Sequence, residues 1–263
     1  MTTVGVFDSG VGGLSVLRAL REALPRVDFV YFADNAFAPY GERPAEWVTQ
    51  RSAAITRWLL AQHHIDALVV ACNTATAAAI DSLRGAHPTL PIVGVEPALK
   101  PAAAHTQTRQ VGVLATRGTL ASERYARLRE RLRQSHPAVQ WHERAAVGLA
   151  AAIETGDTAV TQRLTQEHVS ALLAQAPALD TLVLGCTHYP FAAAAIAQAA
   201  GPGVRLIDTA DAVARRTRDV LDATSTGQGK VTLLASGDAE ALAAAARRWL
   251  GWTEGAEQVG DLR

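Results

Sequence analysis

The chain alternates short apolar runs with longer stretches in which apolar residues recur every three or four positions. Short apolar runs are typical of buried strands, and the longer period is typical of helices with one buried face. The predicted strands cover residues 4–7, 28–32, 67–70, 92–95, 111–114, 139–142, 181–184, 204–207 and 231–235. The predicted helices cover residues 14–23, 45–63, 74–84, 122–133, 158–174, 191–199, 210–223 and 238–250. This alternation predicts an α/β protein with parallel sheets covered by helices on both faces.

An internal repeat divides this pattern into two units. Residues 66–72 read Asp-Ala-Leu-Val-Val-Ala-Cys, and residues 180–186 read Asp-Thr-Leu-Val-Leu-Gly-Cys. The run Val-Gly-Val-Phe at 4–7 similarly matches Val-Gly-Val-Leu at 111–114. We therefore expect two pseudo-symmetric, doubly wound domains, one built from residues 1–97 plus 209–263 and the other from residues 98–208. Because sites in parallel sheets lie beyond the carboxyl ends of the strands, we expect the active site in the cleft between the domains.

Composition narrows the class of protein. Of the 263 residues 49% are hydrophobic and 19% are charged, which allows a large core and excludes a disordered chain. The 25 Lys and Arg residues balance 25 Asp and Glu residues, so no positive surplus is present to bind nucleic acid. No segment is apolar enough for a membrane span, and the chain begins with a strand-like run rather than a signal peptide. These features predict a cytoplasmic protein that binds neither nucleic acid nor a membrane.

Each repeated unit places one of the chain's two cysteines at the carboxyl end of a central strand. Cys72 comes just before a predicted helix, and the positive end of the helix dipole favours the thiolate there. Cys186 occupies the matching position in the second unit. Two thiols that face each other across a cleft suit one reaction in particular, the removal of a proton from one face of a carbon and its return to the other face. The pair therefore indicates a racemase or epimerase.

Other polar residues at the strand ends suggest how such thiols would be assisted. His188 lies two positions after Cys186, and Asp8 ends the first strand, where it would serve Cys72 or a substrate ammonium group. Neither lysine, Lys100 or Lys230, lies in a context typical of a cofactor site, so we expect hydrogen bonds rather than a cofactor to stabilise the carbanion. The groups expected to bind a zwitterionic substrate are Ser9, Asn73, Thr74, Thr187 and the turn Pro39-Tyr40-Gly41.

Taken together, these motifs resemble one family, the glutamate racemases of the aspartate/glutamate racemase superfamily. The resemblance rests on Phe-Asp-Ser-Gly-Val-Gly-Gly-Leu at 7–14, Ala-Pro-Tyr-Gly at 38–41, Ala-Cys-Asn-Thr-Ala at 71–75 and Gly-Cys-Thr-His-Tyr-Pro at 185–190. Thr116, Thr119, Ser122 and Tyr125 also resemble the family's signature after the first strand of its second domain. This resemblance implies a cofactor-independent isomerase that interconverts L-glutamate and D-glutamate. It also implies that the enzyme supplies D-glutamate for peptidoglycan and forms homodimers.

The resemblance also implies roles for individual residues. Cys72, assisted by Asp8, would take the proton from D-glutamate, and Cys186, assisted by His188, would take it from L-glutamate. Glu154, in Ile-Glu-Thr-Gly at 153–156, matches a further catalytic acid of the family, although the segment before it departs from the family pattern. The residues implied in substrate binding are Asp8, Ser9, Tyr40, Gly41, Asn73, Thr74, Thr187 and His188. Because the chain begins at its first strand, we expect no activation by a cell-wall nucleotide precursor.

Four other interpretations are open from the sequence. His188 favours glutamate over aspartate, because aspartate racemases typically carry Glu at this position, yet another acidic amino acid remains an alternative substrate. Gly-Val-Gly-Gly at 10–13 with Asp34 some twenty residues later is similar to the fingerprint of a nicotinamide-dependent oxidoreductase. Cys72, Cys186, His188 and Asp8 would be the four ligands of a zinc site, although we expect no metal. A protein that binds an amino acid without turning it over is the fourth alternative.

Overall fold

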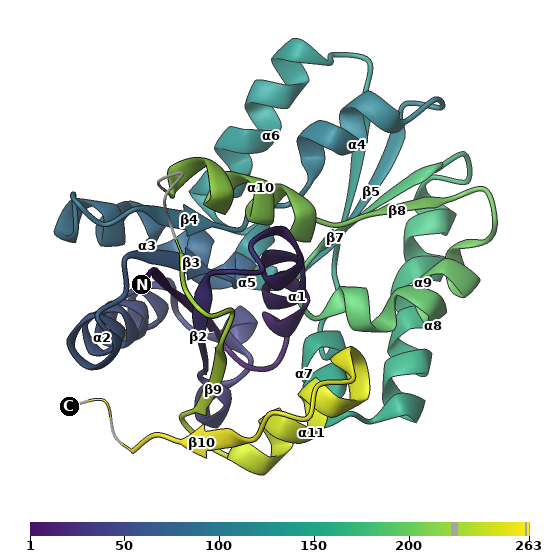
Figure 1. Ribbon diagram of the computed structural model, residues 1–263. Helices are drawn as coiled ribbons and strands as arrows, with labels where there is room; N and C mark the ends of the chain where they lie inside the picture. The colour runs from purple at the N-terminus through teal and green to yellow at the C-terminus, as the bar shows by residue number, and fades with distance from the viewer. Residues whose placement is uncertain (222–225, 261, 263) are drawn as a thin grey trace.

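The computed structural model describes residues 1–221, 226–260 and 262, and two parallel β-sheets organise them (Figure 1). The first sheet has the strand order β10-β9-β2-β1-β3-β4 and the second has the order β6-β5-β7-β8. The strands of the first sheet are β1 (Thr3–Asp8), β2 (Asp28–Ala33), β3 (Ala67–Val70), β4 (Ile92–Gly94), β9 (Val231–Ala235) and β10 (Ala256–Gln258). Those of the second sheet are β5 (Gln110–Ala115), β6 (Gln140–Ala145), β7 (Thr181–Gly185) and β8 (Arg205–Ile207).

The four strands β2-β1-β3-β4 correspond in order and direction to β6-β5-β7-β8. In the first sheet β1 pairs with β2 and β3, and in the second sheet β5 pairs with β6 and β7, all in parallel. The repeated sequence segments thus form the same two central strands of each sheet, β1 with β3 and β5 with β7. The prediction of an α/β fold with two similarly built parallel sheets is confirmed, and all nine predicted strands are present.

Helices cover both faces of each sheet. On the first sheet, α1 (Leu14–Ala23), α10 (Ala210–Val220) and α11 (Ala239–Leu250) lie on one face, and α2 (Ala45–His63) and α3 (Asn73–Ala86) lie on the other. On the second, α7 (Leu149–Thr155), α8 (Thr158–Gln175) and α9 (Ala193–Ala200) lie opposite α4 (Leu99–His105) and α6 (Glu123–Ser135). The short α5 (Arg117–Leu120) and the 3-10 turns η1 (Asn35–Phe37), η2 (Tyr40–Glu42) and η3 (Tyr189–Ala192) complete the set.

Alternation along the strands explains this layering. Val4 and Val6 of β1 face the core shared with α1 and α11, whereas Phe7 faces the core shared with α2 and α3. Strands that are buried on both faces read as continuous apolar runs, which is why their positions follow from the sequence. The predicted helix 210–223 ends at Val220 as α10, and its positions 222 and 223 lie outside the described residues.

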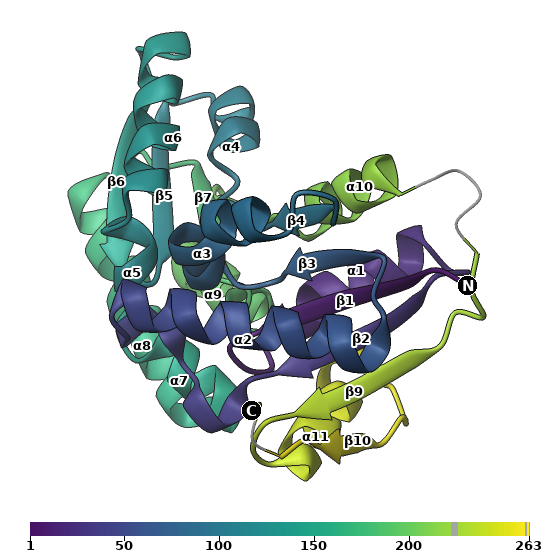
Figure 2. The same ribbon diagram turned by 90° about the vertical axis from the view of Figure 1, so that its left-hand side faces the viewer.

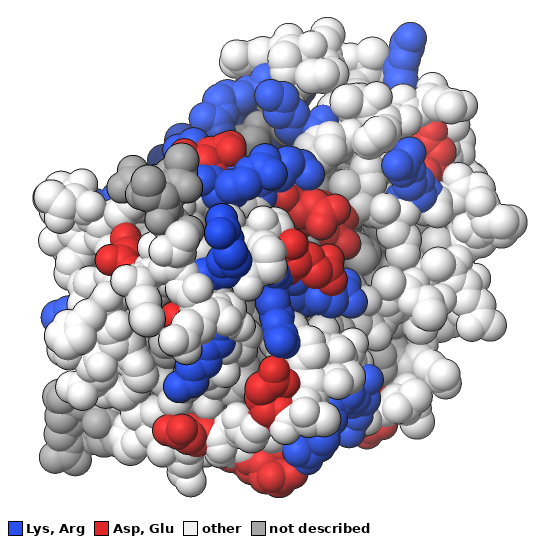
Figure 3. Space-filling view, viewed as in Figure 1, with Lys and Arg blue, Asp and Glu red and all other residues white. Residues whose placement is uncertain are grey.

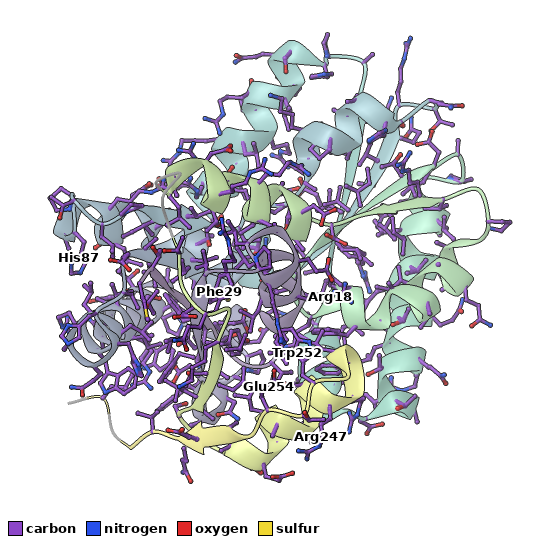
Figure 4. All side chains as sticks on the ribbon, in the orientation of Figure 1. Arg18, Phe29, His87, Arg247, Trp252 and Glu254 are labelled. Carbon is purple, nitrogen blue, oxygen red and sulfur yellow. The ribbon has the colours of Figure 1, made fainter. Side chains whose placement is uncertain are left out.

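The C-terminal segment is attached to the first sheet. β10 pairs with β9, and the guanidinium of Arg21 on α1 lies 4.7 Å from the ring centroid of Trp252 and 3.3 Å from Glu254. Figure 4 shows Trp252 and Glu254 between α1 and the end of α11. On the face shown in Figure 3, basic and acidic side chains are interspersed over α1, α10 and α11. Among the described residues, no helix is both long and apolar enough to cross a bilayer.

Candidate active site

A small cavity lies where the carboxyl ends of the two sheets meet. The strands of the first sheet run toward the second sheet, so the loops after β1 and β3 approach the loop after β7 (Figure 2). The cavity is lined by Ser9, Pro39, Tyr40, Gly41, Cys72, Asn73, Thr74, Thr116, Ala150, Cys186, Thr187 and His188. Both cysteines are free, and each comes from the corresponding strand of its sheet. The two thiols therefore face one cavity from opposite sheets.

Cys72 lies at the junction of β3 and α3. It is the N-cap of α3, and its sulfur accepts a hydrogen bond from the backbone N–H of Ala75 at 3.4 Å. The hydroxyl of Ser9 lies 3.8 Å from the same sulfur. Burial raises the pKa of Cys72 well above its ordinary range, and the nearby charge of Asp8 raises it further. The Ala75 N–H at the helix start lowers the pKa, in the direction expected from the sequence, but burial outweighs this contribution.

Cys186 belongs to a chain of three side chains. Its sulfur lies 3.7 Å from Nδ1 of His188, whose Nε2 lies 2.6 Å from Oε2 of Glu154. Burial by itself would lower the pKa of His188, but the hydrogen bonds to Cys186 and Glu154 prevail and the pKa is raised well above its ordinary value. The raised pKa favours the imidazolium form of His188, which places a positive charge 3.7 Å from the sulfur of Cys186.

Asp8 lies behind the cavity wall and connects the two sheets. One carboxylate oxygen accepts the N–H of Gly10 at 2.8 Å, and the other accepts the hydroxyl of Thr187 at 3.0 Å. The side chain is completely buried, and this burial raises its pKa to about 6, against the opposing influence of the His188 charge and the Gly10 N–H. The cavity-lining side chain that contacts the Cys72 sulfur is Ser9, so Asp8 acts on that thiol through its charge.

The glycines after β1 allow side chains of the second sheet to approach closely. A Cβ on Gly10 would lie 2.3 Å from the carboxylate of Glu154, and one on Gly12 would lie 2.3 Å from Nδ1 of His188. Glu154 also accepts the N–H of Val11 with both carboxylate oxygens, at 2.9 and 3.1 Å. The space that a dinucleotide phosphate would need is occupied by these two side chains. This arrangement argues against the nicotinamide-dependent oxidoreductase.

The wall of the cavity contains polar side chains that could contact a ligand. Asn73 is almost completely buried, and its Nδ2 has no hydrogen-bond partner among the residues that the structure describes. A buried amide without a partner costs free energy, so this group is suited to bind a substrate oxygen. The hydroxyls of Thr74 and Thr116 lie 2.9 Å apart, and Thr116 joins the wall from the second sheet.

The structure thus brings most of the predicted site residues together. Ser9, Tyr40, Gly41, Cys72, Asn73, Thr74, Cys186, Thr187 and His188 line the cavity, whereas Asp8 and Glu154 lie one hydrogen bond behind it. Thr116 and Ala150 line it as well and were absent from the predicted set. For Thr116, its position directly after β5, equivalent to that of Ser9 directly after β1, was a signal that could have found it. Within the described part of the chain, no group of three or more His, Cys, Asp or Glu side chains is placed to bind a metal.

Comparison with known proteins yields one family. A family model described as "Asp/Glu/Hydantoin racemase" matches residues 4–217. The glutamate racemase of Ectopseudomonas mendocina is 48% identical over 240 residues, which are 90% of this chain and 86% of the relative.

Solved structures agree with this assignment. A glutamate racemase isoform of Bacillus anthracis has a TM-score of 0.85 and 31% identity, with 98% of this chain and 97% of that chain covered. The Escherichia coli glutamate racemase, solved with L-glutamate and the activator UDP-MurNAc-ala, has a TM-score of 0.83 and 32% identity, with 98% of each chain covered. On the strength of the sequence match and the shared two-sheet fold, this chain belongs to the Asp/Glu/Hydantoin racemase family.

Proposed function

We propose that this chain is a cofactor-independent glutamate racemase, which interconverts L-glutamate and D-glutamate by proton transfer between two thiols and the α-carbon. The observation that carries the proposal is the pair of free cysteines, Cys72 and Cys186, which come from equivalent strands and line one cavity. Membership of the family and the names of the relatives support glutamate as the substrate. A protein that only binds an amino acid needs no acid and base on opposite faces of a carbon.

In the proposed reaction, the Cys186 thiolate removes the α-proton of L-glutamate as the thiol of Cys72 donates its proton to the opposite face. The C–H bond on one face breaks and a new C–H bond forms on the other, so that one proton is taken up and one is released. His188 stabilises the Cys186 thiolate, and Glu154 holds His188 in its protonated form. The reverse reaction begins with Cys72 as the base.

The two sides of the cavity therefore rest in different states. The raised pKa of Cys72 keeps it as a thiol that can donate a proton, while a protonated His188 lies beside the sulfur of Cys186. This combination suits the reaction of L-glutamate, in which Cys186 is the base and Cys72 is the acid. For D-glutamate, the ammonium group of the substrate would offset the charge of Asp8 and make ionisation of Cys72 less costly.

Substrate binding would use groups that the closed cavity leaves near the two thiols. Asn73 Nδ2 would donate a hydrogen bond to a carboxylate, the start of α3 adds backbone N–H groups, and Thr74 and Thr187 line the same cavity. Ser9, Tyr40 and Gly41 would form the rest of the wall, and Asp8 would attract the ammonium group. Hydrogen bonds that are already in place can stabilise the carbanion without a cofactor, provided that water is excluded.

The cavity must widen to admit the substrate. Its volume is about 10 Å³, which is room for one water molecule. It adjoins a cleft of about 620 Å³, and the two share Gly41 and Thr74 in their walls. Two contacts join the sheets at these walls, the contact of Thr74 with Thr116 in the cavity wall and an ion pair of 3.7 Å between Glu42 and Arg117 in the cleft wall. We propose that glutamate enters from this cleft when these contacts between the sheets separate.

The remaining features of the enzyme follow from the family. We propose that the protein is a homodimer in the cytoplasm and that its D-glutamate is used for peptidoglycan. We also propose the domain limits of 1–97 plus 209–263 and 98–208, because β1 to β4 and β9 belong to one sheet and β5 to β8 to the other.

The test is circular dichroism of L-glutamate incubated with purified protein that has been freed of metal and receives no cofactor. The optical signal should decay to zero, and in heavy water the α-proton should exchange with solvent. L-Aspartate serves as the matched substrate, and we expect it to react far more slowly.

Variants of the two thiols test the mechanism. Cys72→Ser and Cys186→Ser should each slow racemisation by at least about a hundredfold, because a hydroxyl is far less acidic than a thiol and is poorly matched to proton transfer near neutral pH. Near-UV circular dichroism should show that each variant is folded. Substantial turnover in either variant would contradict the two-thiol reaction.

A further inference from the structure

Asp34 has a structural partner that the sequence did not reveal. It follows β2, where a dinucleotide-binding protein would carry the acid that binds ribose, but its side chain is completely buried. Arg51 of α2 binds it with two hydrogen bonds, from Nη2 to Oδ1 at 2.6 Å and from Nε to Oδ2 at 2.8 Å. Only 15% of the Arg51 side chain is exposed. Paired charges with this fork geometry are among the strongest polar contacts in proteins.

The same carboxylate holds the wall of the candidate active site. The hydroxyl of Tyr40 donates a hydrogen bond to Oδ2 of Asp34, and Tyr40 and Gly41 of η2 line the cavity. The hydroxyl of Tyr40 is therefore engaged with Asp34, and the residue can shape the cavity only with its ring and backbone. Arg51 thus reaches the cavity wall at Tyr40 through one intermediate, Asp34.

Aromatic contacts hold the same loop in place. The guanidinium of Arg51 lies 4.4 Å from the ring centroid of Phe37, and the Trp47 ring lies 5.7 Å from Phe37 and 5.5 Å from Tyr40. The backbone N–H of Asp34 donates to the carbonyl of Asp8 at 3.0 Å, which ties the loop to the end of β1. Hydrogen bonds of Asn35 and Ala36 with the residues after β9 hold the start of the loop, and Arg51 with the aromatic contacts of Trp47 holds the rest up to Gly41.

We infer that Arg51 is a positioning residue for substrate binding, which acts through Asp34 to fix the Tyr40–Gly41 wall against the substrate. This inference rests on the proposed racemase function. Arg51 contacts neither thiol nor His188, so its loss should loosen the wall while the proton-transfer groups keep their places. Weaker binding of substrate with little change in the chemical step is therefore the expected signature.

Two variants separate geometry from charge. Arg51→Lys keeps the positive charge but cannot make both hydrogen bonds in the fork geometry. Tyr40→Phe removes only the hydroxyl that joins the wall to Asp34. Each variant should raise the KM for L-glutamate roughly tenfold, which corresponds to about 1.4 kcal/mol, and should leave kcat within about twofold. Arg57→Lys, an exposed position on the same helix, is the matched control and should leave both constants unchanged.

A double-mutant cycle then tests whether the two residues act as one unit. If Arg51 acts through Asp34 and Tyr40, the double variant should lose little more in kcat/KM than the more affected single variant. Additive losses would overturn the inference, as would folded variants with an unchanged KM or with a loss confined to kcat. A wild-type protein that fails to racemise glutamate would overturn the proposed function and this inference together. Normal wild-type activity with normal variants would overturn this inference alone.

Discussion

The buried carboxylate of Asp8 should make the stability of the protein depend on pH in a direction that is unusual for an aspartate. The pKa of Asp8 rises from 3.8 to about 6 on folding, because burial disfavours the charged form. A group whose pKa is raised on folding stabilises the folded state while it is protonated. Its contribution is complete below about pH 3.8 and is lost as the pH rises through about 6.

The size of the effect follows from the shift. At 1.36 kcal/mol per pKa unit, a rise from 3.8 to about 6 makes ionised Asp8 cost the folded state about 3 kcal/mol. Asp8→Asn removes the titration and keeps an oxygen that can accept a hydrogen bond from Gly10 or Thr187. The difference in unfolding free energy between the variant and wild type should therefore shift in favour of the variant by about 2.5 kcal/mol between about pH 4 and pH 8.

Urea unfolding followed by far-UV circular dichroism across this pH range measures the difference. Asp219→Asn, which removes a half-exposed carboxylate, is the matched control for the loss of one negative charge. The reasoning is refuted if the difference between Asp8→Asn and wild type is the same at both ends of this range. A shift of the opposite sign would mean that the Gly10 and Thr187 hydrogen bonds outweigh burial.

Two further substitutions, Gly12→Ala and Glu154→Gln, examine His188, the partner of the Cys186 thiol. Gly12→Ala places a Cβ against the ring of His188 and should lower kcat on the order of a hundredfold, as measured by circular dichroism of glutamate. Gly85→Ala in α3, whose Cβ would meet nothing within 4 Å, should leave kcat unchanged and raise the unfolding free energy by about 0.5 to 1 kcal/mol. Equal activity in both alanine variants would contradict the close approach of His188 to the glycine loop. Glu154→Gln removes the negative charge beside Nε2 of His188 and should lower the pKa of this histidine, followed by its NMR titration. An unmoved titration would show that Glu154 does not keep His188 protonated.

The features predictable from sequence are those encoded by local pattern. Buried parallel strands read as apolar runs, and the internal repeat alone is enough to predict that Cys72 and Cys186 follow equivalent strands. β10 was missed because its three residues, Ala256–Gln258, carry no apolar run. The helices α4, α5 and α7 were missed because each is shorter than two turns, too short for a helical period to show.

The partners of buried charges were out of reach of sequence reasoning. Asp34 and Arg51 meet only because α2 packs beside β2, and no spacing rule links the end of a strand to the second turn of a later helix. The glycine loop was ambiguous for a related reason. A missing Cβ at Gly10 or Gly12 admits a phosphate in one fold and a carboxylate or an imidazole in another, and only the tertiary structure shows which group lies there.

The path of the chain between its two sheets has a consequence for stereochemistry. The chain passes from β4 to β5 through α4, and returns from β8 to β9 through α10, so two covalent connections join the halves. Two units joined by two connections rotate most easily about an axis through both connections, and these connections oppose a sliding motion of one unit past the other. In the proposed reaction, each closure would then return the two sulfurs to opposite sides of the α-carbon, so the route of the backbone would help to maintain the stereochemistry.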